Sequence, residues 1–508
     1  MGDTQDSLDH EFANYTTCHG ASRIANAKNR PHMALWTLVF LAAFGICTWQ
    51  VVDRFQNYFQ YRTGTEIIVE LENELDFPAV TICNFNRIRA SGVSINDQLY
   101  LGAAFYVPSL VDDPEALNAY LNGVDWDSFG ASTALLEDYA GYTLQNGFVL
   151  DNDTLLQCYW RGRPCYAENF THVFTTYGNC WTFNGDKNSS VKQTTPGAGN
   201  GLKLTLDILT DEYTEDPVTG YLEYGLVFQV HDQNEPPRPE LVGTAVAPGS
   251  HTYASTFQTH YKNEPSPWGQ CDPAKGQGHL TYYDTYTLPG CLLECRAKLV
   301  EPCGCRPMYY PGDLDYCSPL NLSSCVLPTL ATFLKNNNEF DACNCTVPCE
   351  YTSYHTTVSY AGYPSPLAAS YLETLFNVSS GYMSQNLVHL DLYYHELMST
   401  TSEQFKAVTP SGLISDVGGQ FGFFIGVSVI TFWEFLEYLV MKFSAFFLFS
   451  RKPSNSNKKV SNKDVLKVDN AMVFENAAAE VAEKTESTEL STIQTKSNGE
   501  KAAVLEMT

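Results

Sequence analysis

Two apolar segments near opposite ends of the chain constrain its fold more than any other feature. Residues 33–53 begin with 20 uncharged residues, enough for a helix to cross the hydrocarbon core of a bilayer. Residues 411–450 are also strongly apolar but include the carboxylates Asp416, Glu434 and Glu437. Because ionisable groups at membrane depth usually face a bundle interior or an aqueous path, we expect the second segment to line a pore.

The residues that flank these segments predict the topology. The first segment begins after 32 residues and lacks a small-residue cleavage site, which argues against a signal peptide. By the positive-inside rule, residues 1–32 and 451–508 are cytoplasmic and residues 54–410 are extracellular, as in a multi-pass plasma-membrane protein. The tail 451–508 has almost no aromatic residues, so we expect it to be disordered. The basic flanking residues are Arg23, Lys28, Arg30, Arg451 and Lys452.

Cysteines and glycosylation sequons agree with this topology. Of the 16 cysteines, Cys18 and Cys47 lie outside the predicted extracellular region, and the other 14 all lie within it. An even number of cysteines in an oxidising compartment predicts disulfides. The same region contains six Asn-x-Ser/Thr sequons. Their asparagines are Asn152, Asn169, Asn188, Asn321, Asn344 and Asn377.

The extracellular region has the pattern of an acidic α+β domain. Its acidic residues outnumber its basic ones by more than two to one, which favours cationic partners and argues against nucleic acid. Residues 96–156 suit short helices, and residues 236–237 and 247–249 suit turns. No catalytic or nucleotide-binding motif is found, so we expect neither an enzyme nor a cofactor. The predicted strands are Ile67–Leu71, Phe77–Cys83, Leu202–Ile208, Gly225–Val230 and Val388–Tyr394.

Ten cysteines are concentrated between Cys271 and Cys349, where they predict a disulfide-stapled subdomain. Two Cys-x-Cys pairs, Cys303/Cys305 and Cys343/Cys345, offer the alternative of a zinc site. Because the region is predicted to be extracellular and has no histidine at finger-like spacing, we favour disulfides and expect no metal site.

The carboxylates of the second segment follow a helical spacing. Asp416 and Glu434 are 18 residues apart, which is five turns of an ideal helix, and Glu437 follows Glu434 by three. One such stripe cannot enclose a pore, so several copies must assemble, with rings of carboxylates attracting cations at both mouths. Alternatively, Glu434 and Glu437 reach the inner interface or pair with Lys442.

Small residues lie between these acidic positions. A helix break at Gly426-Val427-Ser428 would expose carbonyl and hydroxyl oxygens that can replace the hydration shell of a small cation. Irregular backbone at membrane depth is tolerated only where it lines a cavity or is buried in protein. Close helix packing explains small residues equally well, but their place between two acidic positions favours a selectivity filter.

Several motifs together resemble the degenerin/epithelial sodium channel/acid-sensing channel superfamily. The pore segment contains Gly418-Gly-Gln-x-Gly-x-Phe-Ile-Gly-x-Ser428, and His19-Gly20 is similar to the cytoplasmic His-Gly gating motif of the family. The similarity extends from His19 to about Ser450. Further matching segments are Phe77–Asn84, Trp268–Cys271, Gly290–Cys295 and Pro311–Cys317.

This resemblance implies a trimer, homomeric or heteromeric, of two-helix subunits with a disulfide-rich, hand-like extracellular domain. That domain would comprise finger, palm, β-ball, knuckle and a thumb at about 271–349. Sodium selectivity, block by amiloride and a gating role for Ser415 are implied too. Tyr61 and Trp268 resemble an aromatic pair that couples the thumb to the first helix, although core packing explains them equally well. The implied disulfides are Cys83–Cys180, Cys158–Cys165, Cys271–Cys349, Cys291–Cys345, Cys295–Cys343, Cys303–Cys325 and Cys305–Cys317.

Features expected of proton sensing depart from the family pattern. Arg62-Thr63 replaces an expected histidine pair, Leu327 and Ala331 replace thumb carboxylates, and residues 217–222 shorten an acidic finger stretch. Met398 replaces an asparagine, which argues against fast and complete desensitisation. Paired carboxylates titrate near physiological pH because like charges raise a pKa, so thinning them argues against proton gating.

An acidic, aromatic-rich ectodomain suits a cationic aromatic peptide. Within the superfamily the chain most resembles the invertebrate FMRFamide-gated sodium channels, with FMRFamide as extracellular ligand. Proton gating, constitutive opening and a non-channel two-pass receptor are the alternatives. The finger residues that could bind the peptide, or that simply form core, are Tyr100, Phe105, Tyr106, Asp125, Trp126, Asp127 and Phe129.

Overall fold

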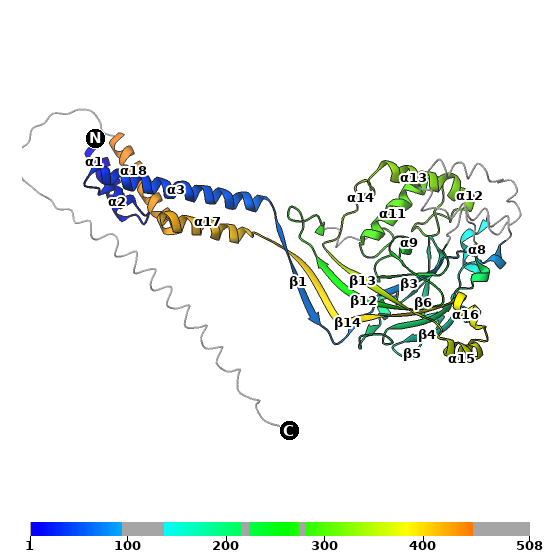
Figure 1. Ribbon diagram of the computed structural model, residues 1–508. Helices are drawn as coiled ribbons and strands as arrows, with labels where there is room; N and C mark the ends of the chain where they lie inside the picture. The colour runs from blue at the N-terminus through cyan, green and yellow to red at the C-terminus, as the bar shows by residue number, and fades with distance from the viewer. Residues whose placement is uncertain (1, 94–136, 215–222, 274–279, 451–508) are drawn as a thin grey trace, which may run out of the picture. The chain divides into compact units, whose positions relative to one another are not determined.

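The computed structural model describes residues 2–93, 137–214, 223–273 and 280–450 (Figure 1). The chain divides into two compact units, one of residues 17–428 and one of residues 1–16 together with 429–508. The larger unit contains two principal β-sheets, a cluster of helices rich in disulfides, and two long apolar helices. The smaller unit, within its described residues, consists of two helices.

The first sheet of the larger unit is built around one long strand, β14. Over Leu387–Leu392, β14 pairs with β9, and over Met398–Lys406 it pairs with β1, both antiparallel. On its other side it pairs in parallel with β12, whose remaining edge carries β13. Strands β4 and β5 continue the sheet beyond β9. The bounds are β1 Thr63–Leu71, β4 Leu155–Trp160, β5 Arg163–Pro164, β9 Leu202–Asp207, β12 Ser250–Lys262, β13 Glu350–Gly362 and β14 Leu387–Lys406.

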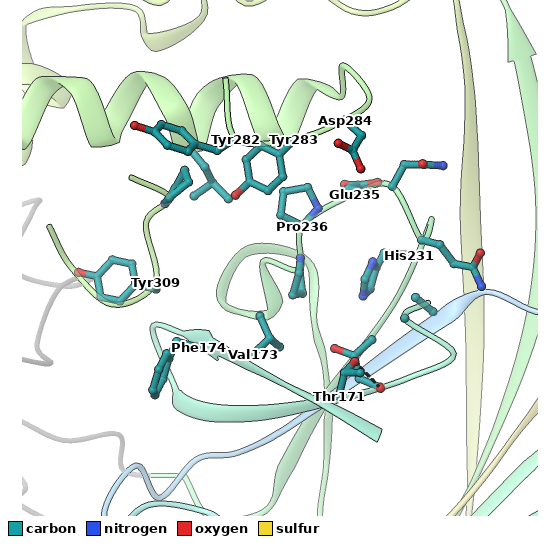
Figure 2. A pocket seen from close by; sticks show the side chains of 18 of the residues that line it. Thr171, Val173, Phe174, His231, Glu235, Pro236, Tyr282, Tyr283, Asp284 and Tyr309 are labelled. Atoms are coloured by element: carbon teal, nitrogen blue, oxygen red, sulfur yellow. Dashed lines mark hydrogen bonds between the residues drawn. The ribbon is translucent and has the colours of Figure 1, made fainter. Parts of the chain in front are cut away.

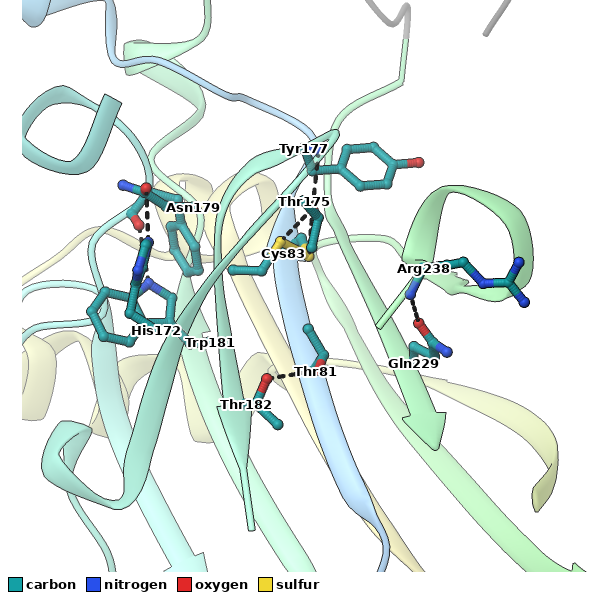
Figure 3. Close-up of a disulfide and its surroundings, with 12 residues drawn as sticks. Thr81, Cys83, His172, Thr175, Tyr177, Asn179, Trp181, Thr182, Gln229 and Arg238 are labelled. Carbon is teal, nitrogen blue, oxygen red and sulfur yellow. Dashed lines mark hydrogen bonds between the residues drawn. A yellow bond between two sulfur atoms is a disulfide. The ribbon is translucent and has the colours of Figure 1, made fainter. Parts of the chain in front are cut away.

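The second sheet has five antiparallel strands in the order β11-β10-β3-β7-β6. Cys83 on β3 lies opposite Cys180 on β7, and the two form a disulfide (Figure 3). Beside it, the hydroxyl groups of Thr81 and Thr182 share a hydrogen bond of 2.8 Å across the same strands. The bounds are β3 Ala79–Asn84, β6 Phe170–Thr175, β7 Gly178–Phe183, β10 Leu226–His231 and β11 Thr244–Val246, and the short β2 Leu75–Asp76 pairs with β8 Lys192–Gln193.

The main core lies between these sheets and explains why the strand sequences alternate. Leu202, Leu204 and Leu206 of β9 are fully buried, as residues two apart on one face of a strand should be. Phe77 contacts the ring of Tyr394 with centroids 6.0 Å apart. The Tyr394 hydroxyl donates a hydrogen bond of 2.8 Å to the backbone oxygen of Asp76, which satisfies the polar atom of a fully buried side chain.

The disulfide-rich helices form a separate core. Helix α11 begins after Thr287, whose side chain accepts a hydrogen bond from the backbone N–H of Gly290. Arg296 of α11 forms a bidentate pair with Glu339, which ties α11 to α14. The bounds of the helical elements in this region are α11 Leu288–Val300, η6 Glu301–Cys303, α12 Pro319–Asn321, η7 Leu322–Val326, α13 Leu327–Asn336 and α14 Glu339–Ala342.

The structure contains seven disulfides, and these are the seven pairs that the family resemblance implied. Five of them join residues between Cys271 and Cys349, so the Cys-x-Cys pairs are disulfide-bonded and not zinc ligands. Cys18 and Cys47 form no disulfide. Among the described residues, no group of three or more His, Cys, Asp or Glu side chains is placed to hold a metal ion.

The long apolar helices of the larger unit are α3, Arg30–Phe59, and α17, Pro410–Ile425, which contact each other. In the smaller unit, α1, Gly2–Tyr15, contacts α18, Val429–Ser450. By length and composition among the described residues, α3 could cross a membrane by itself, and α17 with α18 could form one broken span or a re-entrant segment. The other helices are α2 Ala21–Ala25, α8 Tyr139–Asn146, α9 Pro239–Val242, α15 Pro366–Phe376 and α16 Ser380–Asn386.

All five predicted strands are present, with changed limits. The last predicted strand extends from Leu387 to Lys406 because its C-terminal half pairs with β1, a long-range partner that the local pattern does not reveal. The second begins at Ala79, because Phe77 and Pro78 precede the ladder with β10. Two helices, α1 and α2, form before the first apolar segment, which we did not expect. Most of the predicted helical stretch 96–156 and the whole tail 451–508 lie outside the described residues.

The contact between β9 and β14 generates a stability prediction. Gly201 is buried at the start of β9, and a Cβ there would overlap the backbone carbonyl oxygen of Leu392. Backbone cannot move aside as a flexible side chain can, so we expect Gly201→Ala to lower the free energy of unfolding by about 1–3 kcal/mol. The thermal unfolding temperature of the purified protein measures this loss. Gly362→Ala is the matched control because a Cβ there meets nothing within 4 Å, and equal melting of both variants would contradict the assignment.

Candidate functional site

The predicted filter residues interrupt the second apolar segment. Helix α17 starts after Thr409, whose hydroxyl accepts a hydrogen bond from the N–H of Gly412, and it ends at Ile425. Gly426 follows with a φ of 70°, a left-handed conformation that glycine adopts without steric cost. Its N–H bonds to the carbonyl oxygen of Gly422, and the next helix starts only at Val429. The break that the small residues suggested is therefore present.

The His-Gly motif lies against this break. The backbone N–H of His19 donates a 2.8 Å hydrogen bond to the carbonyl oxygen of Ile425, one of the carbonyls that the end of α17 leaves without a helical partner. The His19 ring packs so closely on Gly426 that an added Cβ would lie 2.6 Å from it. Gly20, with a φ of 92°, turns the chain beside Phe40 of α3 and into α2. Two glycines with positive φ thus allow the motif to reach both apolar helices.

The prediction that Asp416 and Glu434 share one face of a continuous helix is wrong. Asp416 belongs to α17, whereas Glu434 and Glu437 belong to α18, so the break removes the continuous five-turn face on which the prediction depended. Only Glu434 and Glu437 share a helix, at a spacing of three residues. Ser415 and Asp416 are exposed on α17 in the single chain.

In the smaller unit, the N-terminal helix contacts the acidic half of α18. The Thr16 hydroxyl donates a 3.1 Å hydrogen bond to a carboxylate oxygen of Glu434, and the Phe12 ring stacks on Tyr438 with centroids 4.4 Å apart. Asp9 accepts hydrogen bonds from Lys442 at 2.8 Å and from the Tyr438 hydroxyl, and these bonds lower the pKa of the Asp9 carboxyl. Lys442, a candidate partner of Glu434 and Glu437 from the sequence, forms an ion pair with Asp9.

We did not expect this contact, although the sequence contains a signal for it. Asp9, Phe12 and Thr16 are three and four residues apart, the spacing that puts side chains on one face of a helix. A 14-residue polar segment gave no reason to expect a docked helix, because its partner lies more than 400 positions away.

The aromatic pair that the family resemblance implied is in contact. The rings of Tyr61 and Trp268 lie 5.4 Å apart, edge to face, and Tyr58 adds a second ring at 6.2 Å from Trp268. The ammonium group of Lys406 lies 4.3 Å from the centroid of the Trp268 ring, a cation–π geometry, and 3.9 Å from a carboxylate oxygen of Glu264. Lys406 and Tyr58 were not predicted as members of this cluster.

The remaining predicted site residues have mixed outcomes. Leu327 and Ala331 are buried in the disulfide-rich helices, so apolar packing occupies the positions where the resemblance expects carboxylates. The five sequon asparagines whose side chains are described, Asn152, Asn169, Asn321, Asn344 and Asn377, are all exposed. The residues proposed to bind the peptide lie in 100–129, outside the described residues.

Comparisons with known proteins complete the description. The profile of the family described as "Amiloride-sensitive sodium channel" matches residues 12–438. The bile acid-sensitive ion channel of Rattus norvegicus is 35% identical over 458 residues, covering 87% of this chain and 89% of that protein. Acid-sensing ion channel 1 of Gallus gallus is 34% identical, with 84% and 82% covered, and acid-sensing ion channel 2 of Homo sapiens is 32% identical, with 86% and 87% covered. The chain therefore belongs to the amiloride-sensitive sodium channel family, within the degenerin/epithelial sodium channel/acid-sensing channel superfamily.

Proposed function

We propose that this chain forms a sodium-selective, amiloride-sensitive cation channel of the plasma membrane, assembled from three subunits and opened by an extracellular ligand. Both termini are cytoplasmic in this proposal, residues 54–410 are extracellular, and residues 33–53 and 411–450 are the membrane segments. The observation that supports it most is the interruption of the second apolar segment at Gly426-Val427-Ser428, with His19 packed against it. Irregular backbone at membrane depth is expected only beside a cavity or within protein.

The break supplies the chemistry that a sodium filter needs. Carbonyl oxygens freed at the end of α17, together with the Ser428 hydroxyl, are hard ligands that can replace water around a small cation. Three copies around an axis would surround the ion with such oxygens, and rings of Asp416, Glu434 and Glu437 would concentrate cations near the two mouths.

For the opening ligand we propose a peptide of the FMRFamide type. The acidic extracellular composition and the apolar replacements Leu327 and Ala331 support a cationic ligand over proton gating. Protons remain the second candidate, supported by relatives named acid-sensing ion channels. Bile acids are the third, from the relative of Rattus norvegicus, although an acidic surface repels an anion.

One assay separates these candidates. The chain is expressed alone in oocytes, and acid, FMRFamide and a bile acid are applied in turn, each followed by amiloride. We expect amiloride-sensitive inward current with the peptide. Current with acid or bile acid alone would replace the proposed ligand but keep the channel, whereas no current under any condition, with subunits present at the surface, would overturn the channel itself.

The filter assignment predicts an effect on ion preference. Ser428→Leu removes the hydroxyl and fills the narrow region, so we expect the sodium-over-potassium permeability ratio to fall by at least about threefold, which corresponds to about 0.65 kcal/mol or more in relative barrier height. Reversal potentials in mixed sodium and potassium solutions measure the ratio. Ser444→Leu, an exposed serine further along α18, serves as control, and an unchanged ratio in Ser428→Leu would remove Ser428 from the filter.

The packing of His19 on Gly426 predicts a loss of current. An alanine at position 426 would be strained by about 1–2 kcal/mol in the left-handed conformation and would also meet the His19 ring. We therefore expect Gly426→Ala to reduce amiloride-sensitive current per surface subunit by about 5- to 30-fold. Gly419→Ala in α17, where a Cβ meets nothing within 4 Å, should leave the current unchanged.

A double-mutant cycle isolates the steric part of this effect. In a His19→Ala background the ring is gone but the backbone strain stays, so Gly426→Ala should cost less additional current than it does beside histidine. Equal losses in the two backgrounds would show that the His19 ring does not restrict this position.

A further inference from the structure

A cavity of about 440 Å³ lies between the second sheet and the base of the disulfide-rich helices, and its described lining includes none of the predicted pore residues. Figure 2 shows Thr171, Val173 and Phe174 of β6 on one side, with Tyr282, Tyr283 and Asp284, which precede α11, on the other. The loop after β10 contributes Glu235 and Pro236 between them. The volume falls within the range of small-molecule sites.

The lining is aromatic and contains more negative than positive charge. Tyr282, Tyr283 and Tyr309 supply ring faces, and Glu235 and Asp284 supply two carboxylates against the single ammonium group of Lys187. Cations are attracted both by aromatic faces and by carboxylates. A ligand with a positive head and an apolar or aromatic body matches both features.

Two titratable neighbours of Glu235, His231 and Asp232, already have hydrogen-bond partners. His231 contacts the Thr81 hydroxyl through Nε2 and the Asp232 backbone oxygen through Nδ1, and burial lowers the pKa of its imidazole. The Asp232 carboxylate accepts hydrogen bonds from the backbone and side chain of Asn234. Arg238 follows Glu235 by three residues. It lines a second cavity of about 580 Å³ and not this one, whereas Glu235 lines both.

Glu235 differs from these neighbours. Among the described residues, no side-chain hydrogen bond or ion pair to its carboxylate is found. Burial raises the pKa of Glu235 to about 7, while nearby Arg238 opposes the rise and Asp232 adds to it. A carboxylate that is desolvated and lacks a hydrogen-bond donor is costly to ionise, and a bound cation would supply the missing partner.

The geometry points to a binding site for a small organic cation in this cavity, an amine, amidine or guanidine with an aromatic body, held by Glu235 and Asp284 and stacked against Tyr282 and Tyr283. The ligand would bridge β6, the loop after β10 and the segment before α11. The Thr285 hydroxyl, which donates a 3.3 Å hydrogen bond to Asn234, already links two of these elements. None of its described lining residues belongs to the proposed pore.

Protons and the cation compete in this site. Protonation of Glu235 removes the charge that attracts the ligand, so affinity falls as the pH drops below the pKa of about 7. Apart from tyrosines, the charged and titratable groups that line this cavity with Glu235 are Lys187, His231 and Asp284. Those that line the second cavity with it are Asp232, Arg238, His231, His260 and Glu350. Glu235 and Asp284 supply the negative charges of this cavity that the cation neutralises.

Cysteine protection tests the site without requiring current. Val173→Cys places a thiol on the cavity wall of the full-length protein at the cell surface, and its reaction with a cationic methanethiosulfonate reagent is timed at pH 7.5. Benzamidine serves as the probe, and benzoate is the control of nearly identical shape and opposite charge. We expect saturating benzamidine to slow labelling by about tenfold or more, a factor that corresponds to about 1.4 kcal/mol. Benzoate should leave the labelling rate unchanged.

Matched variants identify the counter-charge. Adding Glu235→Gln, or lowering the pH to 5.5, should reduce the protection by benzamidine to less than about twofold, while Glu168→Gln, an exposed carboxylate beside β6, should retain it. Equal protection with and without the Glu235 charge, or equal protection by benzoate, would overturn the proposal, as would no protection at all. If the thiol at position 173 does not label, Lys187→Cys at an exposed lining position replaces it under the same criteria.

Discussion

The antiparallel pairing of β1 with β14 is the constraint on which the rest of the larger unit depends. Strand β1 follows α3, and β14 precedes α17. Their register pairs Thr63 with Lys406 and Leu71 with Met398, so the end of β1 next to α3 lies beside the end of β14 next to α17. The two apolar helices are therefore attached to one hydrogen-bonded ribbon, and they contact each other beyond it. Because β14 also pairs with β9 and β12, the core sheet and the membrane-directed helices share one continuous strand.

Local patterns were sufficient for part of this fold. Strands with alternating apolar residues, such as Leu202–Asp207, follow from their periodicity, and the interruption at Gly426 follows from small residues between acidic ones. Disulfide pairing followed from family resemblance, since spacing alone leaves many connectivities open. The prediction of a shared helical face failed because it assumed one ideal helix. The left-handed turn at Gly426 places Asp416 and Glu434 on two separate helices. The contacts of Asp9 and Thr16, and the cavity at Glu235, require partners far away in sequence, so no local pattern could predict them.

The disulfide-rich helices bury two positions at which the family resemblance leads us to expect carboxylates. Leu327 and Ala331 are buried with Val326 and Leu330, so the positions compared with family carboxylates have become part of an apolar core. Charged groups lie elsewhere in this region, in the pair of Arg296 and Glu339. Three of the disulfides cross-link these helices covalently, whichever side chains occupy positions 327 and 331.

The docking of α1 on α18 has a practical corollary for handling the protein. Deleting the first 16 residues would leave the ammonium group of Lys442 without the carboxylate of Asp9 and would remove a hydroxyl donor from Glu434. Affinity tags and fluorescent fusions placed at the amino terminus sit beside this contact. Electrophysiology on such fusions would therefore report on an altered α18, and labels are better introduced at exposed positions of the larger unit.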